Sequence, residues 1–186
     1  MARPAPKIVY VAISHVSGHV QIMAFITVQF SMNGAIEWER EATSVNVDAD
    51  VRKVAQSHPA LGPVAGWRPI SRDEIPNELT DQMGNRVYRN ALRDVGGVLT
   101  YDLDHAKALA VATIRELRAP MLDALDKRWM RATGQGDAAS AADVEAKRQV
   151  LRDQPAQIDF AAAQSVAEIH TALTKNLADT EAALTA

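Results

Sequence analysis

The sequence predicts an α+β protein, in which an N-terminal antiparallel β-meander of about three strands is followed by a helical C-terminal half with a long αα-hairpin. The prediction depends on a change of period. Apolar residues recur every second position over residues 7–41 and about every 3.6 positions beyond Tyr101. The pair Gly96-Gly97 lies between the two patterns. We therefore expect a β-rich domain over residues 1–97 and a helical region over residues 98–186.

Alternating apolar residues and turn residues mark the three expected strands. The run KIVYVAIS ends at a turn around His15, and HVQIMAFITVQFS continues the alternation. The dipeptide Asn33-Gly34 then predicts a type I′ turn into a third strand, AIEWERE. His15 and His19 flank the first turn. Because they share no helix face, we expect polar turn residues and no metal site.

Residues 42–97 are less regular. The segment VDADVRKVAQSH predicts a short helix that begins at Asp48 and ends near Pro59. The Gly- and Pro-rich stretch that follows is expected to be a loop that presents Trp67. Further on, the spacing of Ser71 and Glu74 predicts a capping box.

An apolar stripe at helical spacing predicts the long helix of the C-terminal half. Its members are Ala110, Ile114, Leu117, Met121, Leu125, Trp129 and Ala132. The Gly134-Gln135-Gly136 turn ends this helix, and a second amphipathic helix follows. We expect a hairpin over about residues 102–153 and a terminal helix over about residues 161–184.

Pro120 lies inside this long helix, where proline removes a hydrogen bond and clashes with the preceding turn. Two solutions exist: a continuous, kinked helix, or two helices with the second beginning at Pro120. The stripe keeps its phase from Ile114 to Leu125, which favours the continuous helix.

Composition narrows the functional classes. The net charge of −3 gives little attraction to nucleic acid or anionic membrane, and the absence of cysteine excludes disulfides and thiolate chemistry. No stretch approaches the ~20 apolar residues that cross a bilayer. We expect a soluble protein made in the cytoplasm, with no nucleic-acid or membrane partner.

The candidates for catalysis have simpler explanations. Asp102, Asp104 and His105 form an acid–histidine cluster, but a helix N-terminus favours both aspartates without any chemistry. No phosphate-binding loop, nucleophile elbow or zinc-protease motif is present. The arginines of the hairpin alternate with acidic residues, which favours a salt-bridged, solvated surface over nucleic-acid binding. We expect no enzyme, cofactor or metal.

The hairpin carries a pattern of the form I-R-x-x-R-A-P-x-L-x-A-L-D, followed by an aromatic residue, Met-Arg-Ala, a turn ending in Gly-Asp and a second helix. Its residues here are Ile114, Arg115, Arg118, Ala119, Pro120, Leu122, Ala124, Leu125, Asp126, Trp129, Met130, Arg131, Ala132, Gly136, Asp137, Arg148, Leu151, Arg152 and Asp153. An upstream segment adds Ile75, Pro76, Arg86, Tyr88, Arg89 and Ala91. About the last half of the chain thereby resembles a group of small bacteriophage tail proteins, often described as tail fibre assembly or tail-associated proteins.

The resemblance implies a structural or accessory protein in the virion tail, assembled in the cytoplasm of the host bacterium. It would dock or support tail fibres or the tail tip or baseplate through protein contacts, and it leaves room for a homo-oligomer. The alternative is a non-virion chaperone that binds fibre subunits transiently. An enzyme with an unrecognised site is the third class.

Large apolar and aromatic side chains are the expected partner-binding residues, because such residues are enriched at binding hot spots. The candidates are Trp67, Tyr88, Leu125, Trp129 and Met130. Trp67 is preferred because it lies in the expected loop, whereas core packing explains the residues of the stripe equally well.

Overall fold

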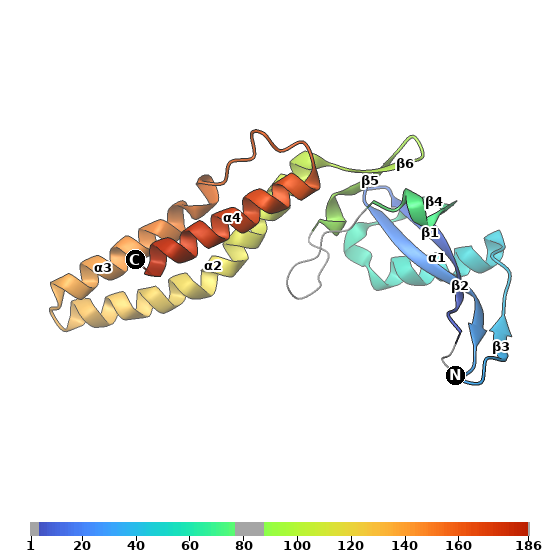
Figure 1. Cartoon of the computed structure of the whole chain (residues 1–186), viewed down its shortest axis with the longest axis horizontal. Helices are drawn as coiled ribbons and strands as arrows, with labels where there is room; N and C mark the ends of the chain where they lie inside the picture. Colours follow the sequence, from blue (N-terminus) through green and yellow to red (C-terminus); the bar gives the residue numbers. More distant parts are fainter. Residues whose placement is uncertain (1–3, 77–87, 186) are drawn as a thin grey trace. The chain divides into compact units, whose positions relative to one another are not determined.

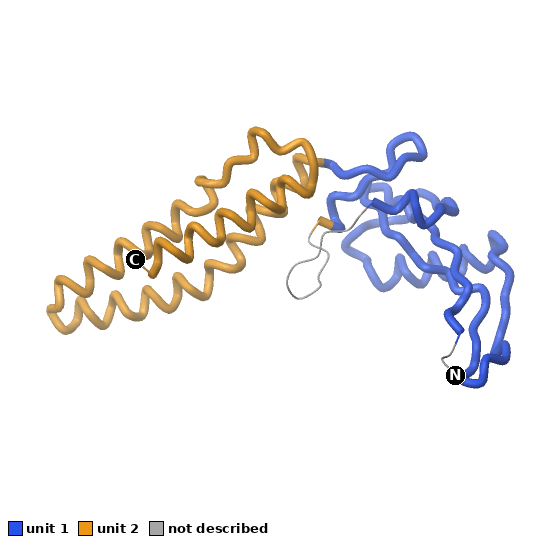
Figure 2. Tube along the Cα trace, viewed as in Figure 1, with its two compact units in different colours: residues 1–78, 89–102 blue, residues 79–88, 103–186 orange. Residues whose placement is uncertain are grey.

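The chain folds into two compact units, coloured separately in Figure 2. The computed structural model describes residues 4–76 and 88–185. The first unit comprises residues 1–78 and 89–102, and the second comprises residues 79–88 and 103–186. Gly96-Gly97, at the expected boundary, turns a hairpin inside the first unit.

A four-stranded antiparallel sheet with the strand order β3-β2-β1-β4 forms the centre of the first unit (Figure 1). Its strands are β1 (Lys7–His15), β2 (Val20–Phe30), β3 (Ile36–Glu39) and β4 (Val64–Ile70). The meander β1–β2–β3 confirms the prediction. Gly34 adopts φ 87° in the turn before β3, a left-handed conformation that glycine tolerates, but Asn33 has no positive φ, so the predicted type I′ turn is wrong.

Strand β4 corrects the expectation of a loop around Trp67. It pairs with β1, so that Trp67 lies opposite Ile13 and Pro69 opposite Val11. Sequence patterns miss it because Gly66 and Pro69 normally argue against a strand. A strand at the edge of a sheet accepts proline, since one of its sides makes no ladder hydrogen bonds.

Helix α1 (Ser44–Ser57) packs against one face of the sheet. It begins one turn earlier than predicted, because the Thr43 side chain accepts a hydrogen bond from the backbone N–H of Asn46. Asp48, the predicted cap, lies inside the helix and accepts a hydrogen bond from the indole N–H of Trp67.

The opposite face of the sheet is covered by a hairpin of β5 (Leu92–Val95) and β6 (Val98–Tyr101). Alternation along β1 explains the two cores: Val11 and Ile13 face α1, whereas Ala12 lies against the hairpin. The described part of the unit also contains the short 3₁₀ segments η1 (Pro59–Leu61), η2 (Arg72–Glu74) and η3 (Arg89–Ala91). The predicted capping box of Ser71 and Glu74 is confirmed on η2.

In the described part of the second unit, three helices contact one another pairwise. They are α2 (Leu103–Gly134), α3 (Ala138–Asp153) and α4 (Val166–Thr185), with a 3₁₀ turn, η4 (Gln154–Ala156), after α3. In Figure 1 they lie side by side. Helix α2 runs without a break through Pro120, which confirms the continuous helix and excludes two helices divided at the proline.

Candidate functional site

The hairpin of α2 and α3 turns on a glycine and a helix cap. Gly136 adopts φ 72°, a conformation that other residues rarely accept. Asp137 follows as the N-cap of α3, and its carboxylate accepts a hydrogen bond from the backbone N–H of Ser140 at 3.0 Å. Hydrogen bonding from the Ser140 side chain, and next from its backbone N–H, lowers the pKa of Asp137 below its usual value. The Gly-Asp pair of the motif is therefore a structural requirement of the turn.

The core of the hairpin consists of Leu125 from α2 and of Val144 and Leu151 from α3. Leu122 and Trp129 pack against this cluster and extend it along α2. Val144 and Leu151, seven residues apart, lie on one face of α3. Most of the large apolar residues in the motif are thus accounted for by packing between the two helices.

Arg118 joins α2 to the end of α3. Its guanidinium donates hydrogen bonds to the backbone carbonyls of Leu151 at 2.8 Å and Arg152 at 2.9 Å. The last carbonyls of a helix have no partner within the helix and carry partial negative charge, so a cation stabilises them. Arg118 is half-buried in this position.

Arg148 makes the second connection, in the middle of the hairpin. Its Nε donates to the carboxylate of Asp126 on α2 at 2.6 Å, and its guanidinium also pairs with Glu145 on its own helix. The guanidinium lies 5.2 Å from the ring centroid of Trp129, a cation–π contact. Asp126, Trp129 and Arg148 are all motif residues, and their contacts hold the two helices in register.

The face that α2 buries differs from the predicted stripe in one place. Ile114, Leu125 and Ala132 are buried as expected, but Leu117 and Met121 are 49% and 43% exposed. The buried face runs through Arg118 and Leu122 instead. The predicted and the observed faces both have helical spacing. The observed face is the buried one because it places the Arg118 guanidinium against the carbonyls at the end of α3.

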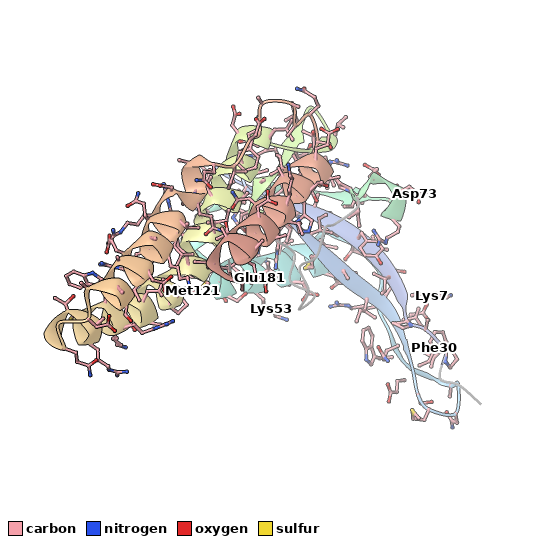
Figure 3. The ribbon with its side chains drawn as sticks, turned by 60° about the vertical axis from the view of Figure 1, so that its left-hand side comes forward. Lys7, Phe30, Lys53, Asp73, Met121 and Glu181 are labelled. Carbon is pink, nitrogen blue, oxygen red and sulfur yellow. The ribbon has the colours of Figure 1, made fainter. Side chains whose placement is uncertain are left out.

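This shift leaves an exposed apolar row on α2, which we call the Leu117 row. Its members are Leu117, Pro120, Met121 and Ala124, all exposed, and spacings of three and four relate Leu117 and Ala124 to the two residues between them. Figure 3 labels Met121 among the side chains of this helix. Exposure also explains how α2 tolerates its proline, since water can hydrate the carbonyl that Pro120 leaves without a hydrogen bond.

The five predicted contact residues have different environments. Leu125 is 9% exposed and Tyr88 is 2% exposed, so both belong to the core of the second unit and are corrected as surface candidates. Trp129 is half-buried beneath Arg148. Met130 is 59% exposed and stays a surface candidate. Trp67 is half-buried against α1 and lines a shallow cleft between α1 and β4.

Tyr88 has an unusual environment for a phenol. Its ring meets that of His170 on α4 edge to face, with 6.1 Å between centroids, and its hydroxyl has no hydrogen-bond partner among the described residues. Burial raises the pKa of Tyr88 to about 12. The aromatic position of the upstream motif is therefore a packing position.

Within the described ranges, no group of three or more His, Asp or Glu side chains is arranged to hold a metal ion. No helix in the described part of the chain is long and apolar enough to span a membrane. No model of a known family, no curated protein and no solved structure matches the chain.

Proposed function

We propose that the chain is a structural or accessory protein of a bacteriophage tail, which docks or supports tail fibres or the tail tip through protein contacts. One observation carries the proposal. The residues of the tail-protein motif are those that build the hairpin: the Gly136-Asp137 turn, Arg118 at the end of α3, and the pair of Asp126 and Arg148. The resemblance therefore describes a coherent three-dimensional element, which supports its use as a guide to function.

The Leu117 row is the docking surface in this proposal. An exposed apolar row at spacings of three and four is the form in which a helix enters a groove on a partner. Pro120 belongs both to the motif and to this row, although the hairpin core does not use it. Packing inside the unit gives no reason for these four apolar residues, whereas a tail partner does.

Met130 offers a second contact point on the same helix. It lies nine positions after Met121. This spacing corresponds to about two and a half turns, so the two methionines face different sides of α2. Separate variants at the two positions therefore show which side of α2 meets the partner.

The test compares surface variants in the phage that encodes the chain. Leu117→Asp combined with Met121→Asp should leave the helical circular dichroism and the melting temperature nearly unchanged, because both side chains are exposed. The tails should lack fibres or fail to assemble in electron micrographs. Val45→Asp is the matched control, since Val45 is 72% exposed on α1 in the other unit, and it should give normal particles.

A folded double variant that still yields complete, infective particles would contradict docking through the Leu117 row. Leu125→Asp is unsuitable for this purpose because the side chain is buried and the variant would lose its fold. The transient chaperone remains the alternative. It predicts the same loss of fibres, but with the chain absent from finished virions.

A further inference from the structure

The first unit contains a cavity of about 370 Å³ between the β1–β2 turn, the loop after α1 and η3. Its polar lining consists of His19, Gln21, Ser57, His58, Arg89 and Asn90. The other described lining residues are apolar, and none of the described residues that line it is Asp or Glu. In a chain of net charge −3, the described lining of this pocket therefore combines polar groups with one guanidinium and no carboxylate.

Hydrogen bonds hold two walls of the cavity together. Ser17, in the β1–β2 turn, donates from its Oγ to the carbonyl of Leu61 at 2.7 Å. His15 is 3% exposed, and its Nδ1 lies 3.0 Å from the carbonyl of Gly62. The two hydrogen bonds thus connect the β1–β2 turn to the successive loop residues Leu61 and Gly62. They fix the position of the loop relative to the turn at this cavity.

Gln21 contributes a side-chain amide to the lining of this cavity. It is 4% exposed, and its Oε1 lies 2.9 Å from Nε2 of His15. Its amide nitrogen has no hydrogen-bond partner among the described residues. Because Gln21 lines the cavity, its amide N–H groups can donate to an acceptor bound there.

Arg89 supplies the charged donor of the cavity, and His58 lines the cavity beside it. Arg89 lies in η3 and is exposed, and its guanidinium makes no ion pair or hydrogen bond with a described residue. Nδ1 of His58 lies 3.1 Å from the carbonyl of Val54, which orients the ring at the end of α1. A guanidinium offers paired donors that match the two oxygens of a carboxylate or phosphate.

We infer that this cavity binds a small organic anion. Arg89 and the amide of Gln21 hold its carboxylate or phosphate group, and its apolar body packs against Pro59 and Leu61. The volume lies within the range of small-molecule sites, which combine an apolar lining with a few convergent polar groups. This site is separate from the Leu117 row, so the inference does not depend on the proposed tail function.

The test is a titration of the full chain with benzoate, phenyl phosphate and uncharged benzyl alcohol, followed by nuclear magnetic resonance. At least one of the two anions should cause saturable chemical-shift changes in the side-chain amide of Gln21 and in the backbone signals of Arg89 and Asn90. Comparison of benzoate with phenyl phosphate identifies the preferred head group. Benzyl alcohol should bind at least about tenfold more weakly, since it lacks the charge that the guanidinium recognises.

Arg89→Gln provides the decisive variant because the side chain is exposed and its loss spares the core. It should weaken anion binding about tenfold or more. Arg52→Gln is the matched control. Arg52 is an exposed arginine of the same unit that lines the shallow cleft between α1 and β4, so its removal should leave anion binding unchanged. Three results would each overturn the inference: no saturable shift up to about 10 mM of either anion, equal binding of benzyl alcohol, or equal weakening by Arg52→Gln and Arg89→Gln.

Discussion

The two units of this chain are stabilised by different kinds of contact. In the first, β4 pairs with β1 from a distant part of the sequence, and apolar residues fill a core on each face of the sheet. In the second, successive helices pack through a thin core, supplemented by Arg118 and Arg148. A short motif can therefore specify the hairpin, whereas no short segment specifies the sheet.

The largest effect is expected at Phe25, at the centre of the sheet core. Its side chain is fully buried, and the guanidinium of Arg40 lies 3.9 Å from the centroid of its ring. Phe25→Ala should lower the free energy of unfolding of the first unit by about 3–5 kcal/mol. Urea unfolding, with separate probes for sheet and helix, measures this change.

Leu151→Ala is the corresponding variant of the hairpin, with a side chain 1% exposed. If each unit has its own core, the two substitutions should act on different transitions. If both variants shift one common unfolding transition equally, the two units do not have separate cores.

A smaller loss is expected when the connection from α2 to the end of α3 is removed. Arg118→Met keeps most of the side-chain length but loses the two hydrogen bonds to the carbonyls of Leu151 and Arg152. The expected cost is about 1–3 kcal/mol in thermal or urea unfolding of the helical unit. Arg115→Met, an exposed arginine on the same helix, is the control and should change stability by less than about 0.5 kcal/mol. If both variants lower the stability equally, the lost positive charge and not the hydrogen bonds of Arg118 explains the change.

Removal of an unpaired hydroxyl should strengthen the second unit. Tyr88→Phe keeps the ring contact with His170 and deletes a buried hydroxyl without a described partner, so a gain of about 1 kcal/mol is expected at neutral pH. The folded protein holds the phenol proton up to about pH 12, whereas the unfolded chain loses it near pH 10. Wild-type stability should therefore fall as the pH rises between these values, by more than that of the variant. If the stabilities of wild type and Tyr88→Phe change in parallel with pH, the buried Tyr88 hydroxyl is not the cause.

The smallest effect is expected at an ion pair of the first unit. Burial favours the neutral form of Asp50, but hydrogen bonds from Arg40 and Lys53 outweigh it and lower its pKa below the ordinary 3.8. A lowered carboxyl pKa stabilises the fold above the unfolded value, and this contribution is lost as the pH falls through the folded pKa. Asp50→Asn should cost about 0.5–1 kcal/mol at neutral pH. Its unfolding curves should converge with those of wild type in acid, and a constant difference at every pH would contradict the pairing.

The sequence patterns predicted the strands and turns that depend on neighbouring residues. Alternation identified β1, β2 and β3, and Asn33-Gly34 identified a turn between two of them. Strand β4 was missed because its pairing with β1 is a tertiary contact that overrides the usual effect of Gly66 and Pro69.

The buried face of α2 and the anion cavity were beyond prediction for the same reason. Leu117 and Arg118 have equally good helical spacing, and only the end of α3 selects Arg118. The cavity unites residues from three distant segments, and His15 resembles an ordinary turn residue until Gly62 and Gln21 enclose it.

The measurement that tests the proposed function most directly is quantitative mass spectrometry of gradient-purified virions beside the crude lysate. A structural role predicts this chain in virions at a fixed molar ratio to another tail protein, and a lower ratio in the variant that carries Leu117→Asp and Met121→Asp. Finding the chain only in the lysate, bound to fibre subunits, would contradict a structural role and identify a transient chaperone. Its absence from both virions and fibre complexes would contradict any role in the tail.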